Sequence, residues 1–356
     1  MTFLSGFGRK QISRMTKILF GVQATGNGHI SRAKLLVKAL EAQGAQVDVL
    51  LSGRGKYFGE AIPEFGRYDY REGLTLHSES GKVSLAKSVY KNNFHHYRRD
   101  IKNFDTSGYD LILTDFEPIS AHAGMRNKKT VISISNQNSL LFPEIAGNLQ
   151  PIDRAFIKKF TPATQYIANF YCDFGLPILP PITALQSDLT EEKNDKILVY
   201  LPFEHPKEIE ALLARLPRVF EIFHPSVKTP RKQENCYWKP ISVKAFEIEF
   251  KSTQKIICNA GFGLTSEALA CGKDLLVKPV KKQPEQIANG RGLSKAGLAM
   301  VADSLNEKLV SDFIQAETDS ATKIRYPNVA TEIAKEICRH GSVDSLKLSK
   351  NLWESA

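Results

Sequence analysis

Two glycine-rich segments carry the residue types in this sequence that could do chemistry. The first is ATGNGHISR at residues 24–32, and the second begins at Asn259 as NAGFGLTSE. In both, a short apolar run precedes the glycines and a helical pattern follows them. Free N–H groups and the dipole at a helix start favour an anion, and glycine allows the backbone to approach it closely. Both segments are therefore candidate phosphate-binding loops.

The first loop departs from a dinucleotide-binding motif. Ser31 stands where a third glycine is required, and the next apolar run ends in Ser52 instead of an acidic residue. His29 lies at the predicted helix start, where the positive dipole disfavours imidazolium, so a neutral imidazole could act as a base or bind a substrate hydroxyl. The alternative is that His29 only caps or packs the helix. The other residues that we expect to meet a diphosphate or an acceptor are Gly26, Asn27 and Gly28.

A pair of acidic residues that could take part in the chemistry follows the apolar segment DLILT. Asp115 and Glu117 come just after this predicted strand, with Pro118 next to them. Carboxylates beyond the carboxyl end of a parallel strand point toward the ligand crevice, where either could bind sugar hydroxyls or deprotonate an acceptor. The alternative is that Asp115 caps the following helix, with Pro118 in its first turn.

The second glycine loop begins a longer block of polar residues. Glu267 is expected in the first turn of its helix, where it could accept two hydroxyls from a ribose. A further strand is predicted at residues 274–277, followed by QPEQIAN at residues 283–289. Polar side chains at the end of that strand could bind sugar hydroxyls, or could form a solvated loop and helix cap.

The predicted elements that position these residues alternate between strand and helix twice. In the first half we predict strands at 17–23, 47–51, 111–114 and 130–134, with helices at 29–43 and 83–104. A proline-rich and then polar stretch at 177–195 is the predicted inter-domain linker. In the second half we predict strands at 196–201, 219–223, 255–258 and 274–277, with helices at 206–216, 264–271, 283–295 and 329–339. The pattern predicts an α/β protein with two Rossmann-like domains facing a cleft, at 1–183 and 184–356, the last helix packing back on the first domain.

The block from Asn259 to Asn289 resembles the donor-binding region of GT-B glycosyltransferases, in which a Gly-rich loop, Ser-Glu, Gly, strand, Pro, Gln and Asn occur in this order. It is most similar to the MurG-like and diacylglycerol glycosyltransferases, related to glycosyltransferase family 28, whose GGTGGH loop resembles residues 24–29. Two departures stand out: Asn27 replaces a glycine, and LPFE, ending in Glu204, replaces a GGS-type loop. Glu204 could therefore serve a different acceptor or donor.

The resemblance implies an inverting transferase that uses a nucleotide-diphosphate sugar, with UDP favoured, and no metal or other cofactor. It implies that Glu267 binds the donor ribose, that Glu285 and Gln286 meet the donor sugar, and that a lipid-linked or cell-envelope compound is the acceptor. The expected donor-binding residues are Gly261, Gly263, Thr265, Ser266, Glu267, Glu285, Gln286 and Asn289.

Composition sets the cellular context. Five scattered cysteines without a CxxC pair indicate a reducing compartment, and no apolar run approaches the length of a membrane-spanning helix. Residues 1–180 hold 23 Lys and Arg against 15 Asp and Glu, so the N-terminal half is basic. The cysteine pattern favours a cytoplasmic protein, and the basic N-terminal half suggests an anionic partner such as a lipid surface. The basic, aromatic-containing pattern at 83–104 favours a core helix with a solvated basic face. The alternative is a helix that lies on the inner face of an anionic membrane.

Three other classes of function remain to be separated from the transferase. A UDP-sugar 2-epimerase of the same fold would need acidic residues around the sugar and would turn over without an acceptor. A non-catalytic nucleotide-sugar-binding protein would bind without turnover. The positive charge also suggests a nucleic-acid binder, but the sequence has no recognisable RNA- or DNA-binding signature, so we expect no nucleic-acid partner. The sequence does not indicate an oligomeric state.

Overall fold

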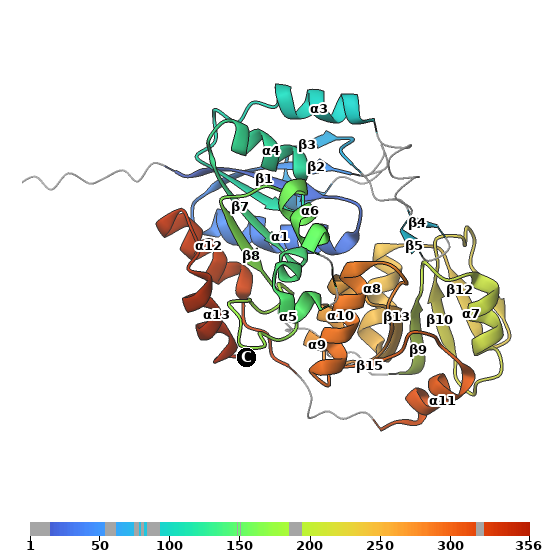
Figure 1. Cartoon of the computed structure of the whole chain (residues 1–356). Helices are drawn as coiled ribbons and strands as arrows, with labels where there is room; N and C mark the ends of the chain where they lie inside the picture. Colours follow the sequence, from blue (N-terminus) through green and yellow to red (C-terminus); the bar gives the residue numbers. More distant parts are fainter. Residues whose placement is uncertain are drawn as a thin grey trace, which may run out of the picture.

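The computed structural model describes residues 15–53, 62–74, 78–79, 82–83, 93–147, 149, 151–184, 194–317 and 324–356. Within these residues the chain forms two α/β domains, each built on its own sheet (Figure 1). The predicted fold class, two Rossmann-like domains, is confirmed.

The N-terminal sheet is parallel throughout, in the order β3-β2-β1-β6-β7-β8. Its strands are β1 (Lys17–Gln23), β2 (Gln46–Ser52), β3 (Tyr68–Arg71), β6 (Leu111–Asp115), β7 (Thr130–Ser135) and β8 (Gln165–Ala168). A small antiparallel hairpin is formed by β4 (Ser78–Glu79) and β5 (Lys82–Val83). The strand order reverses direction between β1 and β6, so ligands are expected at the carboxyl ends of these two strands.

Helices cover both faces of this sheet. Phe20 on β1 packs in the apolar cluster that contains Leu36 of α1, whereas the neighbouring Leu19 packs with Ile119 of α4 on the opposite face. The near-continuous burial of β1 is what a parallel sheet covered on both sides requires. The helices are α1 (Asn27–Ala42), η1 (Pro63–Phe65), α3 (Phe94–Asn103), α4 (Pro118–Arg126), η2 (Asn136–Leu141), α5 (Pro143–Ala146) and α6 (Pro151–Phe160).

The C-terminal sheet has the order β11-β12-β10-β9-β13-β14-β15, and only the β11–β12 pair is antiparallel. Its order reverses between β9 and β13, the counterpart of the β1/β6 position. The strands are β9 (Asn194–Tyr200), β10 (Phe220–Phe223), β11 (Arg231–Gln233), β12 (Cys236–Lys239), β13 (Thr253–Asn259), β14 (Asp274–Lys278) and β15 (Met300–Val301). The helices are α7 (Pro206–Leu213), α8 (Val243–Ser252), α9 (Phe262–Ala270), α10 (Pro284–Lys295) and α11 (Glu307–Gln315).

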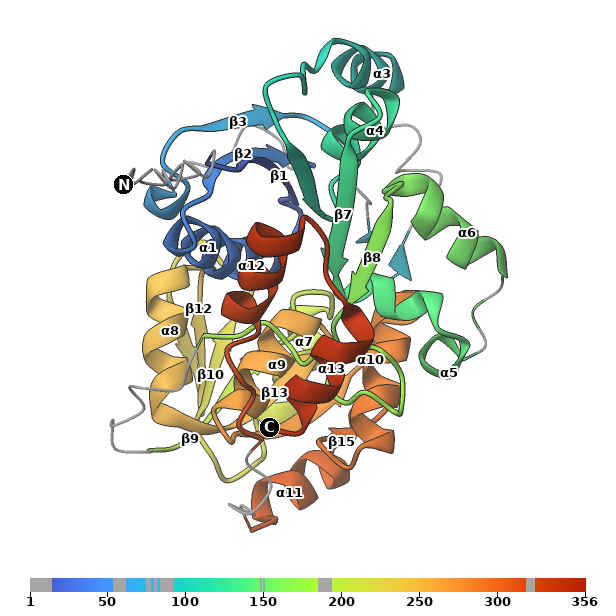
Figure 2. The same cartoon turned by 90° about the vertical axis from the view of Figure 1, so that its left-hand side faces the viewer.

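The chain returns to the N-terminal domain at its end. Helices α12 (Val329–His340) and α13 (Ser345–Trp353) join the apolar cluster of α1 and the N-terminal sheet, and Figure 2 shows α12 beside α1. The indole N–H of Trp353 and the hydroxyl of Ser349 both donate to the carbonyl oxygen of Ile178, at 2.7 and 2.8 Å. Helix α13 therefore holds the start of the segment that we predicted to be a linker, where Ile178 is fully buried.

Two predicted elements differ from the structure. Of the helix predicted at 83–104, Phe94–Asn103 forms α3, whereas Val83 belongs to a β-hairpin, and residues 84–92 lie outside the described part. The predicted linker is packed at least as far as Ile182, which is buried in the apolar cluster of the N-terminal sheet, α1 and α12. Its prolines suit this extended, packed path as well as they suit a solvated connection.

Candidate functional site

The two glycine loops meet face to face across the domain boundary. A Cβ atom added to Gly263 would lie 2.9 Å from the Cα of Gly28, and one added to Gly28 would lie 3.4 Å from the Cα of Gly263. Only hydrogen at these two positions lets α1 and α9 begin so close together. The predicted convergence of the two loops is therefore confirmed by the geometry.

Neither helix start is neutralised by a cap. The N-cap residues Gly26 and Gly261 provide no side-chain hydrogen bond, and the first turns of α1 and α9 contain no acidic residue. Most other helices of the described chain begin with a side-chain cap or an early acidic residue, as α4 does through Glu117. Two uncapped positive helix ends that face one another form a natural site for a diphosphate.

His29, in the first turn of α1, forms a buried polar cluster with the end of β6. Its Nδ1 atom lies 2.8 Å from Oδ1 of Asp115, whose side chain is 0% exposed, while the His29 side chain retains 13% exposure. Burial opposes ionisation of Asp115, but the charge of Arg32 and the hydrogen bonds with His29 and Arg32 outweigh it and hold the pKa of Asp115 below the usual range. Asp115 therefore orients the imidazole. Because its side chain is fully buried and bonded to His29 and Arg32, it is not placed to bind sugar hydroxyls or to deprotonate an acceptor itself, contrary to our expectation.

Arg32 is the third member of this cluster, and we did not predict it. Its Nη2 donates to both carboxylate oxygens of Asp115 at 2.9 Å, and its Nε donates to Oδ2 at 3.2 Å. The sequence does indicate that Arg32 lies beside His29, because residues three apart on a helix share a face and Arg32 follows His29 by three. The sequence does not show that Asp115 lies opposite this face.

Glu117 does not belong to the cluster of His29, Arg32 and Asp115, contrary to our expectation. Its side chain is fully buried, accepts from the hydroxyl of Ser52 at 2.6 Å, and caps α4 through the backbone N–H groups of Ile119 and Ser120. Burial raises the pKa of Glu117, although these hydrogen bonds oppose the rise. The reason for the error is local: Phe116 takes a left-handed conformation, with φ of 56°, so the chain turns between the two acidic residues and directs them apart.

Glu267 lies near the first glycine loop, in the second turn of α9 and not in the first as predicted. Its side chain is mostly buried and makes no hydrogen bond in the described residues. Burial and the nearby Glu247 carboxylate raise the pKa of Glu267 to about 7, while Arg32 acts in the opposite sense. A carboxylate with unused acceptor oxygens beside the helix starts is placed to accept hydroxyl hydrogen bonds.

Several of the predicted donor-binding side chains instead hold the second loop in shape. The side chain of Gln286 accepts from the backbone N–H groups of Ala260 and Val280, and the amide of Asn289 donates to the carbonyl oxygen of Ala260. Thr265 is fully buried, and its Oγ1 lies 2.6 Å from the Tyr171 hydroxyl. These three residues are committed to the protein, so in this structure they shape the site without facing a ligand.

Ser266 and Glu285 differ from these three residues in their hydrogen bonding. Ser266 is buried, and its hydroxyl has no partner among the described residues. Glu285 accepts from the amides of Asn136 and Gln137, both at 3.1 Å, across the domain boundary. These two amides, which belong to η2 and follow β7, also escaped the sequence analysis, because nothing in the sequence indicates that η2 faces α10.

Glu204, in the loop that departs from the glycosyltransferase pattern, pairs with a cation. Its carboxylate lies 2.5 Å from the ammonium of Lys278, at the end of β14, and 3.4 Å from the side-chain amide of Asn259. The pair ties together the loops that follow β9, β13 and β14. The pair places the Lys278 ammonium close to the carboxyl ends of β9 and β13, between which the sheet order reverses.

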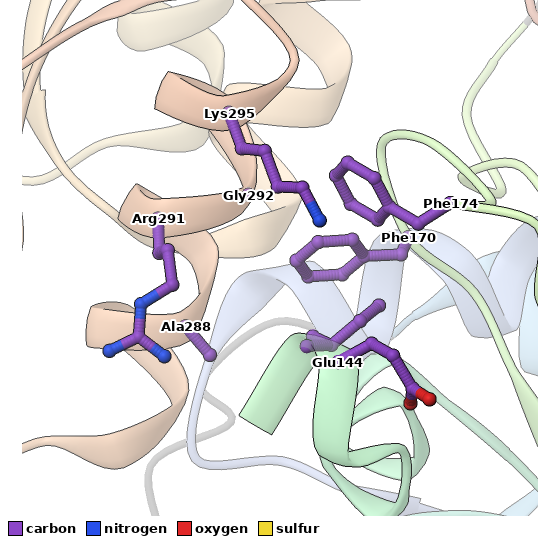
Figure 3. Close-up of a pocket in the computed structure, with 8 residues that line it drawn as sticks. Glu144, Phe170, Phe174, Ala288, Arg291, Gly292 and Lys295 are labelled. Atoms are coloured by element: carbon purple, nitrogen blue, oxygen red, sulfur yellow. The ribbon is translucent and has the colours of Figure 1, made fainter. Parts of the chain in front are cut away.

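Aromatic packing fixes the two domains next to the site. Gly292 of α10 lies against the ring of Phe170, where an added Cβ would lie 2.3 Å from a ring carbon, and the Lys295 ammonium lies 4.5 Å from the centre of the Phe174 ring. Figure 3 shows these residues around a cavity of about 10 Å³, roughly the size of one water. The cavity is too small for a substrate, so this region is a domain contact. 

Among the residues that the structure describes, no helix is long and apolar enough to cross a membrane. In the same residues, no group of three or more His, Cys, Asp and Glu side chains is placed to hold a metal ion.

Comparisons with known proteins agree with this architecture. The family model described as glycosyl transferase family 1 matches residues 16–317, and no curated protein matches the chain. The structure is similar to UGT89C1 of Arabidopsis thaliana complexed with quercetin, with 17% identity, a TM-score of 0.61 and coverage of 96% of this chain and 99% of that one. It is also similar to the glycosyltransferase SnogD from Streptomyces nogalater, with 14% identity, a TM-score of 0.54 and coverage of 96% and 100%. A third similar structure is CalG4, the calicheamicin glycosyltransferase, with 15% identity, a TM-score of 0.55 and coverage of 96% of this chain and 98% of that one.

Two observations identify the family of this chain: its two facing α/β domains and a family match over most of its length. This chain belongs to glycosyl transferase family 1 and is a glycosyltransferase of the GT-B fold.

Proposed function

We propose that this glycosyltransferase moves a sugar from a nucleotide-diphosphate sugar to a hydroxyl group with inversion at the anomeric carbon. The observation that carries the proposal is the meeting of two uncapped helix starts at Gly28 and Gly263, with His29 beside them. The helix starts would hold the diphosphate, and the imidazole would lie where an acceptor approaches.

The reaction is a single displacement. The acceptor oxygen forms a bond to the anomeric carbon as the bond from that carbon to the diphosphate oxygen breaks, and the acceptor proton passes to Nε2 of His29. Asp115 stabilises the imidazolium that forms, since its carboxylate is 2.8 Å from Nδ1. Backbone N–H groups and the dipoles of α1 and α9 stabilise the leaving diphosphate, so we propose that no metal is required.

We propose UDP as the nucleotide. Glu267 would accept the two ribose hydroxyls, and Glu285 would exchange its bonds with Asn136 and Gln137 for bonds with hydroxyls of the donor sugar. In support, UGT89C1 has been solved in complexes with UDP and with UDP-L-rhamnose, at 15% identity to this chain in each case.

For the acceptor we propose a lipid-linked compound at the inner face of the membrane. Helix α6 exposes Ile152 and Phe156, next to the exposed Lys158 and Lys159. The same helix ends at Phe160, whose ring packs 4.9 Å from that of Phe116, the residue that follows Asp115. An apolar surface with basic neighbours thus leads to the catalytic cluster, as an acceptor with a lipid part would need. The alternative is a small-molecule acceptor, favoured by UGT89C1, which was solved with quercetin.

A two-stage experiment tests the proposal with the full-length protein. Thermal unfolding is first measured with a panel of nucleotide sugars, because a ligand that binds the native state raises the unfolding temperature. UDP release is then measured with the best donor and either a lipid extract or a set of small phenols, with and without EDTA. We expect UDP release that depends on the lipid fraction and persists in EDTA.

Each alternative gives a different result in the same experiment. Conversion of the donor sugar without any acceptor would indicate an epimerase, and binding without turnover for all acceptors would indicate a binding protein. Release with phenols only would replace the lipid acceptor by a small molecule. An absence of stabilisation by every nucleotide sugar would contradict the proposal as a whole.

A further inference from the structure

The Nδ1 atom of His29 lies between a hydrogen-bond acceptor and a hydrogen-bond donor. Oδ1 of Asp115 is 2.8 Å away, and Nη2 of Arg32 is 3.0 Å away. A neutral imidazole carries either a hydrogen or a lone pair on Nδ1, so it can bond to only one of these neighbours at a time. Because the two distances are nearly equal, the geometry provides a partner for each tautomer.

Both neighbours of the ring keep their charge and their place. Arg32 is 4% exposed, makes three hydrogen bonds to Asp115 and lies with its guanidinium carbon 6.0 Å from the centre of the Phe262 ring. Asp115 is fully buried and ionised beside Arg32. Among the described residues, Glu267 of α9 also faces the cluster, since the charge of Arg32 acts on its carboxyl group. The imidazole is therefore the only member of the cluster that can change its hydrogen bonding without breaking an ion pair.

The position of the hydrogen at Nδ1 decides whether Nε2 is a hydrogen-bond acceptor or a donor. When Nδ1–H donates to Asp115, Nε2 is unprotonated and can act as a base. When Nδ1 accepts from Arg32, Nε2 carries the hydrogen and can donate to an oxyanion. Exchange between the two states needs only the loss of a proton to water at one nitrogen and the gain of one from water at the other. No other group changes its protonation.

We infer that Arg32 is a positioning residue that gives His29 access to both neutral tautomers, so that a diphosphate at the two helix starts selects the form with hydrogen on Nε2. The same imidazole then serves as a base toward an acceptor hydroxyl and as a hydrogen-bond donor toward the nucleotide product. This inference rests on the proposed function for the identity of the anion, but the tautomer ratio without ligand does not depend on it.

The test is nuclear magnetic resonance of the full-length protein labelled with ¹⁵N in histidine. Long-range ¹H–¹⁵N spectra distinguish the two tautomers, and the His29→Gln variant identifies the His29 signals among those of the eight histidines. Spectra are recorded at about pH 8.5, where an ordinary imidazole is neutral, with and without UDP. The matched variant is Arg32→Met, which keeps the length of the side chain and removes the donor to Nδ1.

We expect the unliganded wild-type protein to give ¹⁵N shifts averaged between the two tautomers, and UDP to raise the share of the Nε2–H form several-fold. In Arg32→Met only Asp115 remains beside Nδ1, so the ring should show the Nδ1–H form with and without UDP. A wild-type ring fixed in the Nδ1–H form under both conditions would overturn the inference, as would an Arg32→Met spectrum that equals the wild-type spectrum.

The experiment still decides the question if the Arg32→Met variant does not fold or if UDP does not bind. If Arg32→Met fails to fold, the wild-type spectra with and without UDP decide alone. If UDP does not bind by calorimetry, the proposed function fails in its nucleotide, and the unliganded spectra of wild type and Arg32→Met still test the tautomer mixture. A fixed tautomer in a protein that binds UDP and transfers sugar would refute the role of Arg32 and leave the proposed function intact.

Discussion

The two glycine loops share a backbone plan but differ in what their side chains do. Each follows a strand next to the position where its sheet order reverses, and each begins a helix without a side-chain cap. The N-terminal loop places a titratable side chain, His29, in a buried cluster from which it remains partly exposed. The C-terminal loop is instead fixed by Gln286 and Asn289, whose side chains bond to its backbone. The comparison teaches that one backbone plan can present a titratable side chain in one domain and be held in a fixed shape by neighbouring side chains in the other.

Removing the imidazole should have the largest effect and sharpen this contrast. We expect His29→Ala to lower kcat by about 10²–10⁴-fold, the usual contribution of a general base, while the affinity for the nucleotide sugar changes little. Turnover and calorimetric donor binding measure the two quantities. His340→Ala, at the exposed end of α12, is the control and should match the wild type. An equal loss in turnover and in donor affinity would mean that His29 only holds the substrate.

A substitution beside the C-terminal loop should change the affinity for the nucleotide sugar more than it changes kcat. We expect Glu267→Gln to weaken nucleotide-sugar binding by roughly 10–100-fold, because a hydrogen bond to a charged group contributes about 1.5–3 kcal/mol, with a smaller effect on kcat. Calorimetry with UDP and with uridine separates the ribose contact from the diphosphate contact. Unchanged uridine binding would remove Glu267 from the site.

Glu267 also predicts a pH dependence of donor binding. Its pKa is raised to about 7 in the folded protein, so the carboxylate form that accepts hydroxyl hydrogen bonds is lost as the pH falls through 7. We expect donor affinity to be constant above this pH and to fall by about tenfold per unit well below it, by proton linkage. Binding isotherms between pH 5 and 8.5 measure the effect. The Glu267→Gln variant should give weak binding without this step, and an equal step in the variant would assign it to another group.

Much of the fold could be predicted because its signals are local. The runs KILFGVQ and LLVK are apolar segments of strand length, and Gly44, just after α1, adopts the positive φ of 84° that ends a helix. The hairpin at Lys82–Val83 interrupts the predicted helix because the period of apolar residues cannot show where a helix starts. Strand β3 escaped detection, since YDYR is short and polar.

The candidate site could be predicted only where function and backbone coincide. Gly28 and Gly263 are visible in the sequence because a close approach requires glycine, and His29 because it directly follows such a loop. Arg32 and the amides of η2 depend on contacts between residues over 80 positions apart, which a single sequence does not contain. Glu117 was misassigned because a carboxylate that caps a helix and one that faces a ligand follow a strand in the same way.

Glu117 provides a test on stability. We expect Glu117→Ala to lower the free energy of unfolding by about 1–2 kcal/mol, the usual cost of losing a helix cap, while KM for the donor stays the same. Urea denaturation and steady-state kinetics measure the two effects. The control is Asn306→Ala, which removes the side-chain cap of α11 in the other domain and should have a similar cost. A loss of kcat comparable to that of His29→Ala, without a loss of stability, would restore Glu117 to the catalytic cluster.

The smallest effect is expected where the two domains share a polar contact. Asn136 of η2 donates to Glu285 of α10, so Asn136→Ala removes one bond that positions this carboxylate without touching reacting atoms. We expect KM for the donor to rise by about fivefold, corresponding to the net worth of one hydrogen bond, about 1 kcal/mol, with kcat nearly unchanged. Asn138→Ala is the matched control, because that amide belongs to the same 3₁₀ helix but bonds only to Ser133 and Ile167 of its own domain. It should lower stability and leave KM alone. If both variants raised KM equally, the shape of η2 and not the contact with Glu285 would carry the effect.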